Sequence, residues 1–300
     1  MKLLKFNPLS FTVWLSLAIA VPAAAQPQAA RAPTRLPLWK VEGKTNSVYL
    51  LGSIHVLNKT NYPLAAPIEA AFQGAQVVAF ETDIGAMSQA DAKMKLLSKA
   101  SLPEGQTLKD QLSAETYAAF IARAEKAGLP EAILAPLKPV MAAVMLLSVD
   151  LVQMGLDPEQ GVDQHYFRRA RDSGKEIVPL ETVDYQIDLI TGLSKEEGEL
   201  VVKSMLKDMA NLRTMLGDLV RAWQTGDTAS LDKLLNEATS ESPAVMKRML
   251  TDRNHNWAPK IEELLRGGKN AIVIVGAAHL VGKEGVVELL RKQGRKVTQL

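Results

Sequence analysis

The sequence predicts an α/β fold with a mostly parallel central sheet, an N-terminal hairpin and a large helical middle. Two short segments with strand-like alternation, 38–42 and 48–52, flank a turn-like stretch and are typical of a β-hairpin. Two further runs, 76–81 and 271–276, are apolar on both faces and indicate strands buried between helices. Because long helical patterns separate these runs, we expect both ends of the chain to build the sheet.

The helical middle is predicted from start and stop signals. Ser113 is a suitable N-cap, Gly128 follows the end of the same pattern, and Ser194 opens a sequence that resembles a capping box. The predicted helices cover 113–127, 137–155, 194–223, 242–250 and 252–265.

The remaining strands are shorter. Because Pro179 cannot donate to a ladder, we expect the strand in 176–181 either to end early or to lie near a sheet edge. A helix over 282–292 and a last strand over 296–298 follow the run 271–276, which predicts a β-loop-α-β crossover unit.

Composition excludes several functional classes. The 300 residues carry 35 Lys and Arg against 33 Asp and Glu, so we expect no nucleic-acid partner. The absence of cysteine excludes thiolate metal sites, a cysteine nucleophile and a lipidated N-terminal cysteine. The sequence also lacks a zincin helix, a serine-hydrolase elbow, a P-loop and a complete dinucleotide fingerprint.

The N-terminus has the three parts of a secretory signal. Lys2 and Lys5 precede the apolar run 11–21, and three alanines, 23–25, suit a cleavage site. We expect a signal peptide over 1–25, an Ala/Pro-rich linker over 26–37 and a folded domain over 38–300. The mature protein would then be periplasmic or secreted, without a stable membrane anchor. The alternative is that the N-terminus stays uncleaved as an anchor.

A four-residue pattern that ends in histidine follows two predicted strands. The pattern is Gly52-Ser53-Ile54-His55 in the first case and Gly276-Ala277-Ala278-His279 in the second, and Glu81 ends a third strand. Ligands of open α/β sheets bind at the carboxyl ends of strands, so we expect these side chains to converge if the strands are neighbours. Two imidazoles and a carboxylate, His55, His279 and Glu81, match a catalytic site for a divalent metal such as Mn, Co or Zn. The other two histidines, His165 and His255, are weaker candidates.

This ordered set of motifs resembles the TraB/PrgY/GumN family, which includes TIKI-like proteins. Two positions depart from the family pattern: Ser53 stands where threonine is commoner, and Ala278 where glycine is frequent. The matching landmarks are 38–39, 48–55, Glu81, 161–163, 180–182, 253–254, Trp257, 275–282 and Gly285.

The resemblance implies a fold related to erythromycin esterases and ChaN-like haem-binding proteins. It also implies metal-dependent proteolysis, with His55, Glu81 and His279 as metal ligands or catalytic groups. Arg253 and Asn254 would contact the substrate or a developing oxyanion.

Three functions stay open from the sequence. The first is a metal-dependent hydrolase of the peptidase type, in which Glu81 or Glu181 takes the proton of a metal-bound water. The second is a metal-free, esterase-like hydrolase that activates water with histidine and glutamate. The third is a non-catalytic protein that binds haem or a peptide. The expected partner is a peptide or small-molecule substrate in the first two cases.

Overall fold

A computed structural model describes residues 35–209, 211–239 and 243–300. The signal peptide and most of the linker that the sequence predicts lie outside these residues. Leu36 is buried, and its amide donates to the carbonyl of Leu300. Pro37 likewise accepts from the amide of Gly52. The folded domain therefore includes at least two residues that the sequence assigned to the linker.

Six strands form one sheet in the order β4-β3-β5-β2-β1-β6. Strands β2, β3, β4 and β5 run parallel to one another, while β1 is antiparallel to both of its neighbours. The predicted α/β class, mostly parallel sheet and N-terminal hairpin are thus confirmed. The strands are β1 (Leu38–Glu42), β2 (Ser47–Ser53), β3 (Val77–Phe80), β4 (Glu176–Pro179), β5 (Ala271–Gly276) and β6 (Val297–Gln299).

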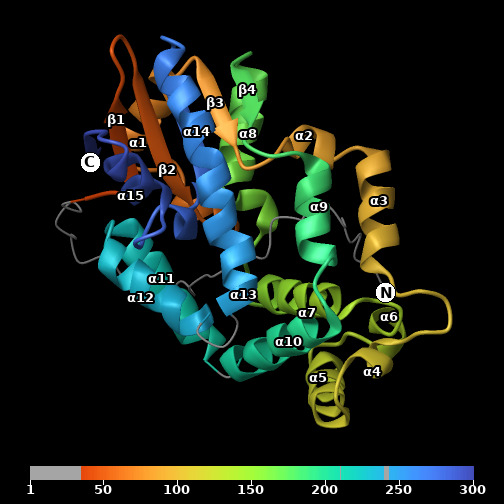
Figure 1. Cartoon of the computed structure of the whole chain (residues 1–300). Helices are drawn as coiled ribbons and strands as arrows, with labels where there is room; N and C mark the ends of the chain where they lie inside the picture. Colours follow the sequence, from red (N-terminus) through yellow and green to blue (C-terminus); the bar gives the residue numbers. More distant parts are fainter. Residues whose placement is uncertain (1–34, 210, 240–242) are drawn as a thin grey trace.

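Helices flank the sheet and fill the middle of the chain (Figure 1). The longer ones are α1 (Ala66–Gly74), α3 (Ala90–Ala100), α5 (Ala114–Lys126), α7 (Pro139–Gln153), α8 (Val162–Asp172), α9 (Val183–Thr191), α10 (Lys195–Met209), α11 (Leu212–Gln224), α12 (Thr228–Thr239), α14 (Asp252–Arg266) and α15 (Val286–Lys292). The short ones are α2 (Ile84–Met87), α4 (Leu108–Gln111), α6 (Glu131–Leu134) and α13 (Pro243–Met246), with 3₁₀ turns at Lys59–Asn61, Pro158–Gln160 and Ala277–His279.

The strand patterns explain the layer arrangement. Every residue of β5 is buried, as expected for a strand with neighbours on both sides and helices over the sheet. Helix α14 crosses the sheet in Figure 1 and contacts β2, while α8 contacts β3 and β4. The edge position predicted for the strand that contains Pro179 is confirmed in β4.

Two sequence expectations need correction. The helix expected over 194–223 is two helices, α10 and α11. The helix expected over 242–250 contains only one regular turn, α13, and continues as a π-helical segment over Lys247–Thr251 that leads into α14. The last strand, β6, pairs with β1 and is separated from β5 by the two hairpin strands, but it runs in the same direction as β5, as the predicted crossover unit requires.

The helical middle is tied directly to the sheet. The indole Nε1 of Trp223, in α11, donates to the carbonyl of Gly52 over 2.7 Å. A buried indole needs such an acceptor, so this contact fixes α11 at the end of β2. No helix in the described part of the chain is long and apolar enough to span a bilayer.

Candidate active site

The ends of three adjacent strands bring the sequence motifs together. Ser53 at the end of β2 pairs with Gly276 at the end of β5, and Phe80 of β3 pairs with Ile274 of β5. His55, Glu81 and His279 follow these ends and are all buried. The expectation that the two motifs and the acidic residue meet at one edge of the sheet is therefore correct for the strands that carry them.

His55 is paired with a carboxylate that the metal hypothesis did not include. Its Nδ1 lies 3.1 Å from Oδ1 of Asp163, at the start of α8. The contact is close but lacks the alignment of a good hydrogen bond. Burial acts to lower the pKa of His55, but the negative charge of Asp163, aided by that of Glu81, outweighs burial and raises this pKa above 6.5.

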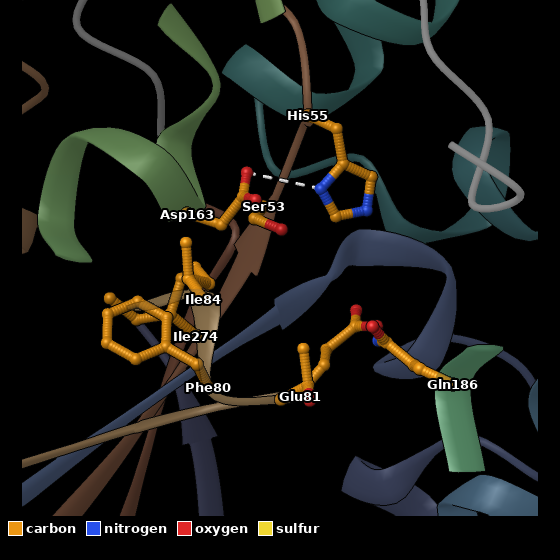
Figure 2. Close-up of a pocket in the computed structure, with 9 residues that line it drawn as sticks. Ser53, His55, Phe80, Glu81, Ile84, Asp163, Gln186 and Ile274 are labelled. Carbon is orange, nitrogen blue, oxygen red and sulfur yellow. Dashed lines mark hydrogen bonds and ion pairs between the residues drawn. The ribbon is translucent and has the colours of Figure 1, made fainter. Parts of the chain in front are cut away.

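A small cavity of about 10 Å³ lies between His55 and Glu81. Figure 2 shows both side chains directed toward it from segments that follow the ends of two different strands, β2 and β3. Such a volume has room for about one water molecule. In the described part of the chain, four buried polar atoms of its lining residues have no hydrogen-bond partner: Ser53 Oγ, Nε2 of His55, Thr82 Oγ1 and Gln186 Oε1. Nδ1 of His55 and Oδ1 of Asp163, which also lie here, have only their contact with each other.

Glu81 is held as an anion. Its Oε1 accepts from the amide of Gly276 over 2.8 Å, and its Oε2 accepts from Nη2 of Arg253 over 2.6 Å. Burial acts to raise the pKa of Glu81, but Arg253 and the other hydrogen-bonding and charged neighbours outweigh burial and lower this pKa to about 2. Glu81 is consequently a weak base at neutral pH.

Arg253 forms a fork between two carboxylates. Its Nε donates to Oε2 of Glu181 over 3.1 Å, and Nη2 donates to Oε1 of Glu181 over 2.7 Å as well as to Glu81. Nη1 donates to the carbonyl of Met249 and to Nε2 of His279, each over 3.1 Å. A guanidinium has five N–H hydrogens, so each of them has an acceptor here.

Glu181 holds the guanidinium of Arg253 in place. Both of its oxygens bind Arg253, and Oε2 also accepts from Nε1 of Trp257 over 3.0 Å. Burial raises the pKa of Glu181 in spite of the neighbouring Arg253. Because Glu181 does not line the cavity at His55, the structure gives it no contact with a water there.

His279 is fully buried beneath α14. Its Nδ1 lies 2.6 Å from Oδ1 of Asn254, whose Nδ2 donates to the carbonyl of Glu284 over 2.8 Å. The ring also packs on the indole of Trp257, with centroids 4.4 Å apart. Burial, aided by the charge of Arg253, lowers the pKa of His279 to about 3.

Comparison with known proteins matches residues 37–299 to the model of the TraB/PrgY/gumN family. The chain belongs to the TraB/PrgY/gumN family. It is also 22% identical, over 276 residues, to an uncharacterized protein of Treponema pallidum (strain Nichols), a match that covers 85% of this chain and 80% of that protein. No solved structure matches the chain. The resemblance of the sequence motifs to this family is thus confirmed, and the match spans almost the whole described domain.

The metal set that the TraB/PrgY/gumN resemblance implies does not fit the donors as they lie. His279 presents Nε2 to the guanidinium of Arg253, and Glu81 uses one oxygen on Arg253 and the other on Gly276. A metal ion bound by these atoms would have to displace the positively charged guanidinium of Arg253. Among the described residues, no group of three or more His, Asp or Glu side chains is arranged to hold a metal ion.

Two glycines of the TraB/PrgY/gumN motifs allow the site to close. A Cβ on Gly52 would lie 3.1 Å from Cα and Cβ of Ala277, so the first motif packs directly on the second. A Cβ on Gly161 would lie 2.4 Å from the carbonyl oxygen of His55, so the start of α8 could not approach. Gly161 thereby brings Asp163 to His55.

The two weaker histidine candidates lie outside the cluster of His55, Glu81 and His279. His165 stacks on Tyr62, with ring centroids 4.0 Å apart, and His255 is exposed and pairs with Glu284. Asp163 is the functional candidate that sequence reasoning missed, although its motif was recognised as a family landmark. Its signal was the glycine before a predicted helix start, since this pattern indicates a close approach of backbones.

Proposed function

We propose that this TraB/PrgY/gumN protein is a hydrolase that cleaves the amide bond of a peptide or the ester bond of a small molecule, with a water activated by His55. The observation that carries the proposal is the cluster of unpartnered polar atoms around the cavity at His55. Buried polar groups in folded proteins normally have partners, so a cluster of exceptions around one water-sized space indicates a built site for a polar reactant.

His55 is better suited than Glu81 to take the proton of the water. A general base works best when its pKa lies near the operating pH. The pKa of Glu81 lies at about 2, whereas that of His55 lies above 6.5. Glu81 and Asp163 then stabilise the imidazolium that forms, because both carry negative charge close to His55.

The proposed reaction uses atoms that line the cavity. Nε2 of His55 accepts a proton as the water oxygen bonds to the substrate carbonyl carbon. The oxyanion that develops can accept from the hydroxyls of Ser53 and Thr82, which are buried and unpartnered in the described structure. When the bond to the leaving group breaks, the imidazolium returns the proton to that group.

The proposal gives Arg253 and Asn254 a role that differs from the sequence expectation. The N–H groups of the guanidinium donate to Glu81, Glu181, His279 and a backbone carbonyl. Asn254 uses its amide on Glu284 and its carbonyl on His279. In this arrangement both residues support the carboxylates and the second imidazole, and the proposal assigns oxyanion contact to the hydroxyls.

A larger pocket lies at the second motif, and the proposal assigns substrate binding to it, although none of its lining residues lines the cavity at His55. It has a volume of about 570 Å³, within the range of small-molecule and peptide side-chain sites. Asn254 and Ala278 are among its lining residues, and Leu250 and Val281 add apolar surface. The charged residues Asp232, Lys247 and Lys283 lie around it, so the lining suits a substrate with both apolar and polar groups.

Two other functions receive less support from the arrangement. A metal-dependent peptidase of the kind implied by the resemblance would need Arg253 to release His279 and Glu81. A haem held by both motif histidines would likewise need Arg253 to release Nε2 of His279. The proposed mechanism therefore uses neither a metal ion nor a porphyrin.

Export is a separate part of the proposal. The basic, apolar and small-residue parts of 1–25 support cleavage after Ala25 and action outside the cytoplasm. Expression of the full chain in a bacterial host tests it. Intact mass of the protein recovered from the periplasm should correspond to a chain that begins at Gln26, while an unprocessed chain would contradict export by cleavage.

The activity is tested with the protein from Gln26 onward against a peptide library and a panel of aryl esters, each with EDTA and with added Mn²⁺, Co²⁺ or Zn²⁺. We expect hydrolysis that survives EDTA and is lost in His55→Gln. The matched control is His255→Gln, which changes an exposed histidine and should retain activity. Hydrolysis that EDTA abolishes, or that His55→Gln retains, contradicts the proposed mechanism.

A further inference from the structure

The two histidines of the repeated motif occupy different chemical environments. His55 faces a cavity and has an unpartnered Nε2. His279 has 0% exposure and contacts on both ring nitrogens, with Asn254 at Nδ1 and Arg253 at Nε2. Equivalent positions in the sequence pattern therefore do not imply equivalent roles.

The hydrogen-bond network fixes the tautomer of His279. Because Nδ2 of Asn254 donates to the carbonyl of Glu284, Oδ1 is the atom that faces the imidazole. An amide oxygen only accepts, so Nδ1 of His279 carries the proton. This leaves the lone pair on Nε2, which accepts from Nη1 of Arg253 over 3.1 Å. The assignment follows from the partners of each atom, as it must for histidine.

The same guanidinium closes Nε2 to a second cation. A metal ligand nitrogen lies roughly 2.0–2.1 Å from zinc. A metal at that distance from Nε2 would compete with Nη1 for one lone pair and would stand beside a buried positive charge. To make room, Arg253 would have to leave Glu81 and Glu181, and two buried carboxylates would lose their counter-ion.

We propose that His279 is a positioning residue, whose neutral Nε2 holds the Arg253 guanidinium between Glu81 and Glu181, and that it is not a metal ligand. Asn254 sets the tautomer that makes this possible, and the indole of Trp257 packs against both the imidazole of His279 and the guanidinium of Arg253. The role rests on the proposed function in one respect: Arg253 keeps Glu81 ionised at the edge of the cavity where His55 activates water. In this proposal His279 of the second motif holds Arg253 between the two carboxylates, while His55 of the first motif performs the proton transfer.

The direct test does not require any activity. The chain contains four histidines, so selective ¹⁵N labelling of histidine gives a tractable NMR spectrum of the whole mature protein. His279, identified by the signal lost in His279→Gln, should show the pattern of a neutral ring protonated at Nδ1. Addition of Zn²⁺ should leave its Nε2 signal unchanged. A ring protonated at Nε2, or an Nε2 signal that shifts with saturation as Zn²⁺ is added, overturns the proposal.

Two substitutions separate an acceptor from a space-filling ring. His279→Gln keeps an oxygen that can accept from Arg253, whereas His279→Phe keeps an aromatic ring without any acceptor. We expect His279→Phe to lower kcat about 10- to 100-fold, as loss of a supporting partner typically does, and His279→Gln to recover most of that loss. KM should change little in either variant.

The controls distinguish failure of this inference from failure of the proposed function. If both His279 variants lose kcat equally while His55→Gln is inactive and the wild type is active, the positioning role is wrong and the hydrolase remains. If Zn²⁺ binding measured by titration calorimetry weakens in His279→Gln but not in His255→Gln, His279 is a ligand and the inference is also wrong. If no variant or wild type has activity, the NMR result alone decides the role of His279.

Discussion

Oδ1 of Asn254 lies 2.6 Å from Nδ1 of His279, and this contact determines which imidazole nitrogen can accept from Arg253. Asn254 and Arg253 are neighbours at the start of α14, directly after the π-helical segment Lys247–Thr251. A π-helical turn shifts the direction of the side chains that follow it, and such turns are frequent at functional sites. In this protein the segment places two consecutive side chains on the same buried imidazole.

Arg253 should be important for stability as well as for activity. Arg253→Met leaves Glu81 and Glu181 buried without a counter-ion, a change that typically costs about 3–5 kcal/mol. The matched control is Arg221→Met, which removes an exposed ion pair worth about 0–1 kcal/mol. Urea denaturation at pH 7 measures both free energies of unfolding. Equal values for the two variants would show that the buried fork does not hold the site together.

Glu81 should make the protein sensitive to acid. Its folded-state pKa is about 2, below the ordinary 4.5, so the ionised form is favoured by folding. The resulting stabilisation is complete above pH 4.5 and is lost as the pH falls toward 2, at about 1.4 kcal/mol per pKa unit.

The pH dependence of unfolding by urea checks this contribution. Between pH 5 and pH 3, wild type should lose more stability than Glu81→Gln, which has no carboxylate to protonate. Glu104→Gln, on an exposed turn, should follow the wild-type slope. A slope for Glu81→Gln that equals the wild-type slope contradicts the paired state of this carboxylate.

Gly161→Ala should disturb the site by moving the start of α8. The added Cβ would meet the carbonyl oxygen of His55 at 2.4 Å, so the start of α8 must move and carry Asp163 away from the imidazole. We expect a loss of about 1–3 kcal/mol, typical of overpacking, together with reduced kcat. Gly74→Ala is the control, because its Cβ would meet nothing within 4 Å. Thermal unfolding and kinetics of both variants measure the effect, and a Gly161→Ala protein that matches wild type would refute it.

The pocket beside the second motif should govern substrate affinity. Leu250→Ala removes apolar lining there and should raise KM about tenfold, with kcat nearly unchanged, because the lost contact is made equally in the ground and transition states. Leu97→Ala, on the outer face of α3 with 63% exposure, is the matched control. Steady-state kinetics on the substrate found by screening provide the measurement. An equal KM for the two variants would place substrate binding elsewhere.

Part of the framework of the site was predictable from local patterns. The runs that end at Glu81 and Gly276 are apolar on both faces, which is typical of a strand covered by helices, and motifs at the carboxyl ends of neighbouring parallel strands converge. That β3, β5 and β2 are neighbours is evident only in the folded chain. The N-cap at Ser113 and the edge strand at Pro179 were equally local signals.

The contacts within the site were not predictable in the same way. The pairing of His55 with Asp163 depends on how closely α8 docks, and no spacing in the sequence encodes that distance. The position of Arg253 between Glu81 and Glu181 depends on the rotation of α14, which the π-helical segment sets. A set of two histidines and a glutamate fits metal chemistry by residue type, while the intervening guanidinium appears only once the chain is folded.

The dependence of kcat/KM on pH, in wild type and in Asp163→Asn, tests the activation of water by His55 most directly. Since the base must be unprotonated, activity should rise with pH through the pKa of His55, which Asp163 raises above 6.5. Removal of the carboxylate charge should move this limb to lower pH and reduce the plateau. A limb at the same pH in both proteins, or one that persists in His55→Gln, would contradict the mechanism.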